Sequence, residues 1–439
     1  MHASFEYRSA ISLATARFPI DVEAASTNSS LGLNQQIVMY ENLAIFAAFI
    51  FIYSLLNGGL ERTPINGAVV FTVFGFIMGS ECLGLLKMTI TAEALRTLAE
   101  VTLALVLFTD AANANLKILK HSSQLPKRLL LIGLPLTITL GFGAGLLLFD
   151  GLSMLEVAII ATMLAPTDAA LGKAVVSNQE VPAEMREGLN VESGLNDGIC
   201  VPILFLFLAL IGGRGGEEGP HMLALHLFAE EIGIGLGVGI GITLIASICI
   251  KFAAKRGWIT ETWQQVPVLA VALSCFTTAQ LIGGSGFIAC FTGGLLFGSL
   301  VKKHKHEVLL SAETTGDTLS LITWVCFGAA AVGQSIGAFT WEVFLYSILS
   351  LTVIRMLPVF LVLTGTKYRT DQKLFMGWFG PRGLASIVFA VIVLNDKLPH
   401  GDTISMTAVC TILLSVILHG ISANPFIALL AARSKRERS

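Results

Sequence analysis

VESGLND, residues 191–197, is the stretch that decides how this chain folds. It places two carboxylates, an amide and a hydroxyl immediately before a long apolar run. At 3.6 residues per turn, Glu192 and Asn196 lie on one face of a helix, and Ser193 and Asp197 lie on a second shared face. The stretch therefore predicts a polar stripe along a helix whose remaining surface is apolar.

The composition around this stretch is that of a membrane protein. Of the 439 residues, 54% are hydrophobic and only 13% are charged, about half the charged share of an ordinary soluble domain. The mean hydropathy is +0.76. These values exclude a soluble multidomain enzyme, a disordered chain and a disulfide scaffold. Nothing in the sequence predicts a cofactor or binding to nucleic acid.

About thirteen apolar segments approach the length of roughly 20 residues that a membrane-spanning helix needs. We therefore expect an all-α polytopic membrane protein, with a transmembrane domain over residues 39–432. The predicted spans are 40–56, 65–83, 95–116, 127–149, 154–176, 185–211, 223–252, 264–283, 286–301, 314–334, 341–364, 372–394 and 403–431.

The basic residues predict the orientation of these spans. Most of the 28 Lys and Arg residues fall in alternate connecting segments, on the side that also holds the C-terminus. Cytoplasmic segments carry such an excess of Lys and Arg, so we expect the short basic tail at 433–439 to be cytoplasmic. The protein itself is expected in the cell (inner) membrane. At the other end, Met39 immediately precedes the first span, and residues 1–38 are expected to be a disordered or spurious extension.

Two predicted spans are interrupted beside a charge. The fifth contains Pro166-Thr167-Asp168, and the twelfth contains Gly380-Pro381-Arg382-Gly383. If spans one to six repeat as eight to thirteen, both interruptions fall in the fifth helix of their half. Interrupted helices at matching positions of two inverted repeats are the best sequence indication of a transporter's binding site.

Each charge inside a span costs at least ~2.5 kcal/mol and therefore needs a partner or a role. Asp197 is the strongest candidate for binding a cation or a proton, because carboxylate oxygens suit hard cations such as sodium. Arg355 is expected to pair with Glu192 as a fixed strut. Arg382 is expected to offset the negative helix ends where the broken helices cross.

These residues carry a family likeness. The segment at 192–198, with Thr167-Asp168 before it and Arg355 and residues 380–383 after it, resembles the NhaP-type sodium/proton antiporters of the monovalent cation:proton antiporter superfamily. The resemblance extends from about residue 40 to 432. It implies a homodimer, in which each protomer has a dimerisation part and a six-helix ion-translocating part with two crossed broken helices.

The resemblance also implies roles for single residues. Asp197 would bind the cation and the proton in turn, and Asn196, where electrogenic relatives carry Asp, implies electroneutral exchange. The resemblance implies that Asp168, Ser193 and Thr167 are neighbours of the ion. It also implies that Glu192 and Arg355 form a structural ion pair. Asp110 is a possible accessory acid.

The expected function is therefore exchange of Na⁺ or Li⁺ for H⁺ by alternating access, and it would serve pH homeostasis. We expect the protein to lie in membrane lipid and to have no enzyme activity. A K⁺/H⁺ antiporter on the same scaffold is one alternative, and a passive cation channel is another. An intramembrane serine protease built on Ser285 and His419 is a third. For Ser193 and Asn196, taken alone, a structural role in hydrogen bonds between helices is as well supported as a role in binding the ion.

Alternating glycines mark the seventh span, over residues 233–241. Gly233, Gly237 and Gly241 are spaced by four, which matches the small-xxx-small pattern of close helix contacts. This face could serve dimerisation, but we expect it to pack against another helix of the same protomer.

Overall fold

The computed structural model describes residues 22–60, 63, 66–87, 91–114, 123–169, 171–213, 220–260, 263, 265–301 and 305–436, and every regular element in these ranges is a helix. The elements are α2 (Val22–Leu60), α3 (Gly67–Met78), α4 (Ala92–Asn113), α6 (Gln124–Arg128), η1 (Leu129–Gly133), α7 (Leu134–Leu148), α8 (Met154–Met163), α9 (Lys173–Val176), α10 (Ala183–Ile211), α11 (Pro220–Lys255), α12 (Val266–Leu281), α13 (Gly286–Leu300), α14 (Lys305–Cys326), η2 (Phe327–Val332), α15 (Gly333–Ser335), η3 (Ile336–Ala338), α16 (Trp341–Leu351), α17 (Val353–Val362), α18 (Thr370–Trp378), α19 (Leu384–Asn395) and α20 (Gly401–Arg436).

Many of these helices are built to cross a membrane. Within the described ranges, seven continuous helical stretches are long and apolar enough to span a bilayer, and five further apolar helices have 10–17 residues. The chain is therefore a multi-pass membrane protein. Each of the predicted spans overlaps one helix or a broken pair of helices. That all of them cross the bilayer, to a total of about thirteen, stays a prediction.

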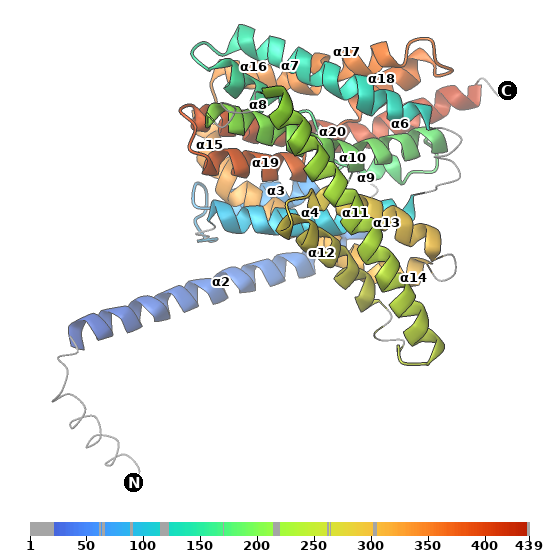
Figure 1. Ribbon diagram of the computed structural model, residues 1–439. Coiled ribbons are helices and arrows are strands. Elements are labelled where there is room, and N and C mark those ends of the chain that lie inside the picture. Colours follow the sequence, from blue (N-terminus) through green and yellow to red (C-terminus); the bar gives the residue numbers. More distant parts are fainter. Residues whose placement is uncertain are drawn as a thin grey trace.

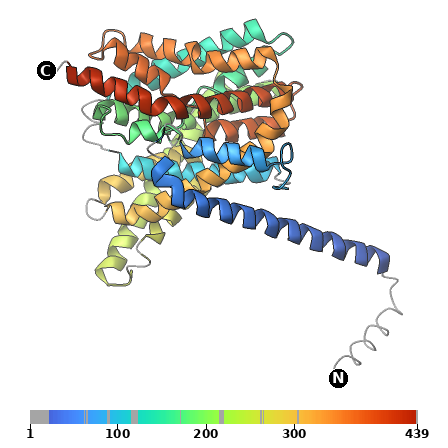
Figure 2. The ribbon, with the colours of Figure 1, turned by 180° about the vertical axis from the view of Figure 1, so that it is seen from behind.

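Helix α2 extends beyond the rest of the molecule at its N-terminal end (Figures 1 and 2). Its C-terminal half packs on α3, where the Phe49 and Phe74 rings stack with centroids 3.6 Å apart. The division predicted between residues 38 and 39 falls inside this helix. Residues 1–21 lie outside the described part of the chain, so the predicted extension stays a prediction.

The remaining helices form two neighbouring groups (Figure 1). We call α3, α4 and α11–α14 the scaffold unit, and α6–α10 with α16–α20 the crossing unit. Close backbone contacts hold the scaffold unit together. A Cβ atom at Gly294 or Gly298 of α13 would lie only 2.3 Å or 2.0 Å from the carbonyl oxygens of Phe108 and Ala112 of α4. Only glycine permits α13 and α4 to approach so closely.

Helix α10 of the crossing unit packs on α13 of the scaffold unit through two more glycines. A Cβ atom at Gly194 would lie 2.1 Å from the Phe291 ring, and one at Gly198 would lie 2.3 Å from the Ile288 side chain. The polar stripe of α10 is therefore next to a glycine face that lies directly against the scaffold.

The expected packing of the Gly233-Gly237-Gly241 face of α11, the seventh span, inside the protomer is wrong, whereas its use in dimerisation stays a prediction. Gly235 and Gly239 face α13, because added Cβ atoms would lie 2.8 Å from the Ser285 carbonyl oxygen and 2.4 Å from that of Ala289. Added Cβ atoms at the predicted face, Gly233, Gly237 and Gly241, would meet no atom within 4 Å. Both glycine sets have the same spacing, and the position of α13 decides which one packs.

Two helices of the crossing unit are broken where the sequence predicts interruptions. Helix α8 ends at Met163 and α9 begins only at Lys173. Helix α18 ends at Trp378 and α19 begins at Leu384. Non-helical segments join the halves, and proline prevents either break from closing into a helix. The two breaks meet, and they define the candidate site.

Candidate functional site

Asp168 joins the two breaks. Its backbone N–H donates to the Pro381 carbonyl oxygen at 2.8 Å. Its carboxylate accepts the Leu384 N–H at Oδ2 (2.7 Å) and the Leu171 N–H at Oδ1 (3.2 Å). Leu384 is the first residue of α19, where backbone N–H groups lack helical partners and the helix dipole is positive. Asp168 is thus a charged cap that holds the two broken helices together.

This arrangement leaves no room at Gly383. A Cβ atom there would lie 1.9 Å from Asp168 Oδ2. We expect Gly383→Ala to push the carboxylate off the start of α19 and to lower the free energy of unfolding by about 1–3 kcal/mol, the usual range for overpacking. Heating detergent-solubilised protein and measuring the folded fraction by size-exclusion chromatography would show a lower thermal midpoint.

Gly237→Ala is the matched control for this prediction. The added methyl meets nothing within 4 Å, and alanine is the better helix former. Its thermal midpoint should equal or exceed that of the unsubstituted protein. Equal midpoints for Gly383→Ala and Gly237→Ala would contradict the crowding at the crossing.

Side chains of α10 satisfy the backbone of the first break. Ser193 Oγ donates to the Thr167 carbonyl oxygen and accepts the Ala169 N–H, both at 2.7 Å. Asn196 Nδ2 donates to Thr167 Oγ1 at 2.8 Å. The predicted neighbours Thr167, Ser193 and Asn196 are all buried and come together here. Hydrogen bonds of this kind also fix α10 against the broken helix.

Asp197 lies on the same stripe, and only 1% of its surface is exposed. Within the described part of the chain, Oδ1 of Asp197 and Oδ1 of Asn196 have no hydrogen-bond partner. Ser193, one helical turn before Asp197, is hydrogen-bonded to the first break. A buried carboxylate oxygen without a donor is costly. A proton or a bound cation on Asp197 removes that cost.

A small cavity of about 10 Å³ lies at the crossing. That volume holds about one water-sized sphere. Its walls are Thr167, Asp168, Ala169, Gly172, Val175, Val176, Leu189, Ser193, Phe379 and Pro381. The cavity thus reaches the break residues and the Ser193 side of the polar stripe.

Glu192 and Arg355 form a buried ion pair between α10 and α17. Arg355 Nη1 donates to Glu192 Oε1 at 2.5 Å, and Nη2 donates to Oε2 at 2.8 Å. Each side chain is 1% exposed. The guanidinium also lies against the second break, because a Cβ atom at Gly380 would lie 2.5 Å from Arg355 Nε. Two parallel bonds of this kind fix direction as well as distance.

Arg382 is completely buried at the second break. Its Nη1 donates to the Gly380 carbonyl oxygen at 2.8 Å, which places the cation at the free carbonyl end of α18. Its backbone N–H donates to Ser415 Oγ at 2.7 Å. Nε and Nη2 have no partner among the residues that the structure describes.

Ser415 and His419 of α20 support this break, and sequence reasoning missed this role. His419 Nε2 lies 2.9 Å from the Trp378 carbonyl oxygen, and Nδ1 lies 3.1 Å from Ser415 Oγ and 3.0 Å from the Ser415 carbonyl oxygen. A serine and a histidine four residues apart in an apolar span were the available signal. The alternative pairing of His419 with Ser285 does not form, because both ring nitrogens of His419 contact Ser415 or Trp378, and Ser285 Oγ caps α13 by accepting the Ile288 N–H at 3.3 Å.

Asp110 lies elsewhere, in a cavity of about 250 Å³ between the two units. An ion pair crosses this cavity from α9 to α14, with Lys173 Nζ 2.6 Å from Asp317 Oδ2. Asn113 contacts Glu313 nearby. The structure therefore places Asp110 in a different cavity from the one at the crossing, among charged groups at the boundary of the two units.

Known proteins resemble this chain over most of its length. The family described as "Sodium/hydrogen exchanger, transmembrane" matches residues 40–429. The Na⁺/H⁺ antiporter of Saccharomyces cerevisiae is 26% identical over 386 residues, which cover 82% of this chain and 38% of the yeast protein. The K⁺/H⁺ antiporter NhaP2 of Shewanella oneidensis is 22% identical over 291 residues, covering 63% of this chain and 47% of that protein. The matches thus cover less than half the length of each of these two curated relatives.

A solved structure shares the fold. The sodium proton antiporter MjNhaP1 from Methanocaldococcus jannaschii at pH 8 superposes with a TM-score of 0.68 at 22% sequence identity. The match covers 90% of this chain and 99% of that one. The arrangement of crossed broken helices is therefore embedded in an architecture that is already known.

Proposed function

Because this chain belongs to the sodium/hydrogen exchanger family, we propose that it exchanges a monovalent cation for a proton across the membrane. The observation that carries the proposal is Asp197. It is a buried carboxylate with one oxygen lacking a donor, and it lies beside the crossing of two broken helices. Such a group needs a proton or a cation, and it accepts either.

Competition for Asp197 couples the two fluxes. An empty, charged carboxylate is expensive to carry through the apolar interior, whereas a protonated or cation-bound one is not. The site therefore changes sides only when it is occupied. Asn196 Oδ1, a buried oxygen next to Asp197 that also has no partner among the described residues, is the neutral ligand that we assign beside Asp197.

The exchange is electroneutral in this proposal. Both carboxylate oxygens of Asp168 already accept backbone N–H groups, so we assign Asp168 to the helix cap and not to the exchange. The negative charge of Glu192 is neutralised by its ion pair with Arg355. Only Asp197 then changes its occupant, so one proton is exchanged for one Na⁺.

Alternating access would follow from movement of the crossing unit against the scaffold unit. The contact of Gly194 with Phe291 lies on this boundary, as does the charged cavity that contains Asp110. The family resemblance supports a homodimer joined through the scaffold unit. The distribution of Lys and Arg supports a cytoplasmic C-terminus, in the cell membrane.

Na⁺ or Li⁺ is the first choice of cation, since the yeast relative is named a Na⁺/H⁺ antiporter. K⁺ is the second candidate, since the Shewanella relative is named as a K⁺/H⁺ antiporter. The oxygen ligands at the crossing suit all three ions. Ion size and dehydration decide between them.

Purified protein in proteoliposomes tests this proposal. The vesicles contain a trapped pH dye, are acidic inside, and are held at zero membrane potential. Adding Na⁺ or Li⁺ outside should make the lumen alkaline, and a response to K⁺ alone would support the second candidate. Cation entry without proton movement would indicate a channel. No cation-dependent proton movement at any pH from about 5 to 9 would overturn the proposal.

A further inference from the structure

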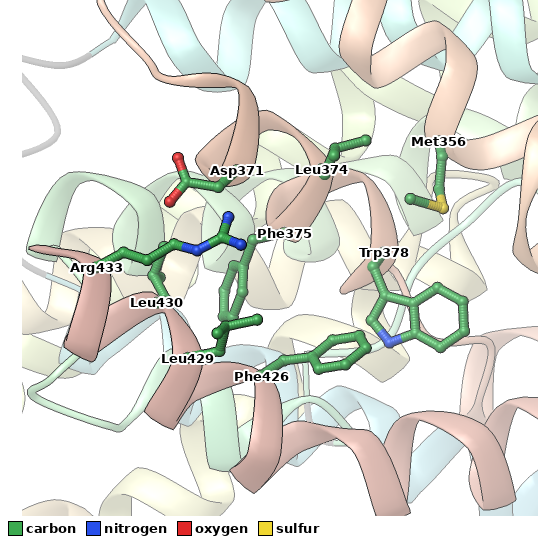
Figure 3. A pocket seen from close by; sticks show the side chains of 9 residues that line it. All are labelled: Met356, Asp371, Leu374, Phe375, Trp378, Phe426, Leu429, Leu430 and Arg433. Atoms are coloured by element: carbon green, nitrogen blue, oxygen red, sulfur yellow. The ribbon is translucent and has the colours of Figure 1, made fainter.

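An apolar groove of about 360 Å³ lies on the crossing unit between α17, α18 and α20, and Trp378, the last residue before the second break, forms part of its wall. Its walls include Leu374, Trp378, Phe426 and Leu429 (Figure 3). Leu374, Phe426 and Leu429 are 44%, 40% and 51% exposed, so the groove is open to the surroundings of the protein. We call it the α18–α20 groove.

One end of the groove is charged. Figure 3 shows Asp371 and Arg433 at this end and Trp378 with Met356 at the other. Asp371 is already paired, because Arg369 Nε donates to its Oδ1 at 3.0 Å and Arg369 Nη2 contacts Oδ2. Arg433 is exposed at the same end. The charged end therefore carries more positive than negative charge.

The surroundings of this groove are lipid, since the exposed apolar surface of a membrane protein faces acyl chains. With the orientation given under the proposed function, on which this inference rests, the charged end lies at the cytoplasmic leaflet. That leaflet holds the anionic lipids, and basic groups near it bind their headgroups. We propose that the α18–α20 groove binds an anionic phospholipid, with one acyl chain between α18 and α20 and its phosphate on Arg433.

Occupation of the groove acts on the second break. The Trp378 indole Nε1 donates to Ser422 Oγ at 2.8 Å, and the Trp378 carbonyl oxygen lies 2.9 Å from His419 Nε2. Ser415 Oγ lies between His419 Nδ1 and the backbone N–H of Arg382. A continuous hydrogen-bonded path thus leads from the groove wall to Arg382. A lipid that fixes Trp378 also fixes the end of α18.

Brominated lipids test the binding directly, because bromine on an acyl chain quenches a nearby indole. Trp378 is left as the sole tryptophan by replacing Trp258, Trp263, Trp324 and Trp341 with Phe. This full-length protein is placed in phosphatidylcholine nanodiscs with rising fractions of brominated phosphatidylglycerol or brominated phosphatidylcholine. We expect about fivefold preference for the glycerol lipid, the worth of one basic residue at an anionic surface. Arg433→Gln should abolish that preference.

Lys251→Gln, at the end of α11 in the scaffold unit, is the matched control and should keep the preference. Equal quenching by both lipids, or a preference that survives Arg433→Gln, would overturn the proposal. Shielding of Trp378 from both lipids would show that a protein surface covers the groove, and would also overturn it. Native mass spectrometry of the unsubstituted protein repeats the comparison, should Trp324→Phe impair folding. None of these measurements involves ion transport, so their outcome is independent of the outcome of the antiport assay.

Discussion

Replacing Asp197 with Asn is expected to reduce cation-driven proton movement to the level of protein-free vesicles. The amide neither takes up nor releases a proton in the accessible pH range, so it cannot alternate between two occupants. The fold should persist, because Asn has the same shape and removes a buried charge that lacks a donor. We therefore expect a thermal midpoint equal to or above that of the unsubstituted protein, together with complete loss of exchange.

Asp396→Asn is the control for this result. Asp396 is an exposed carboxylate just after α19, and its replacement should leave both exchange and the thermal midpoint unchanged. Measurable exchange by Asp197→Asn would mean that another acid carries the proton. Asp110, in the cavity between the two units, would then be the next carboxylate to replace.

Arg355→Ala is expected to have the largest effect on stability. It leaves Glu192 as an uncompensated buried charge, and loss of one partner of a buried pair costs about 3–5 kcal/mol. It also empties the space beside Gly380 at the second break. The thermal midpoint in detergent should fall steeply, and the yield of monodisperse protein should fall with it. Removing both charges with Glu192→Gln in the same chain should restore part of the loss.

Lys367→Ala provides the comparison. Lys367 Nζ lies 2.6 Å from Glu184 Oε2, yet the Lys367 side chain is 67% exposed, so water screens this ion pair. Exposed pairs contribute about 0–1 kcal/mol. A loss for Arg355→Ala no larger than that for Lys367→Ala would show that the buried pair is not a structural strut.

The breaks in α8–α9 and α18–α19 were predictable because their causes are local. Proline removes a backbone donor wherever it stands, and a charge beside it has few reasons to be in a span. The polar stripe of α10 was predictable for a similar reason, since helical spacing alone puts Ser193 and Asp197 on one side. In each case the cause and its effect lie within about two turns of the same helix.

The role of Asp168 could not be deduced in this way. Its carboxylate accepts the N–H of Leu384, a residue 216 positions later in the chain. The sequence shows a buried acid, but it does not show that the start of a distant helix supplies its donor. The family resemblance implied only a neighbour of the ion at Asp168, and the crossing of the two breaks reveals the cap.

Packing between helices was hard to predict for the same reason. The glycines of α11 have two equivalent sets at the same spacing, and only the position of α13 selects Gly235 and Gly239. The support of Arg382 by Ser415 is a similar case, because it joins α20 to a break in a different helix. Spacing predicts which residues share a face, but not which face is covered.

The glycine face of α10 has a consequence for the energetics of sliding. Gly194 and Gly198 are one helical turn apart, or about 6 Å along the axis. The space that each glycine leaves by having no side chain is filled by Phe291 at Gly194 and by Ile288 at Gly198, both from α13. A shift of one turn along the axis would bring Asn190 or Pro202, in place of a glycine, against one of these two side chains. The two glycines therefore favour a single axial register of α10 on α13.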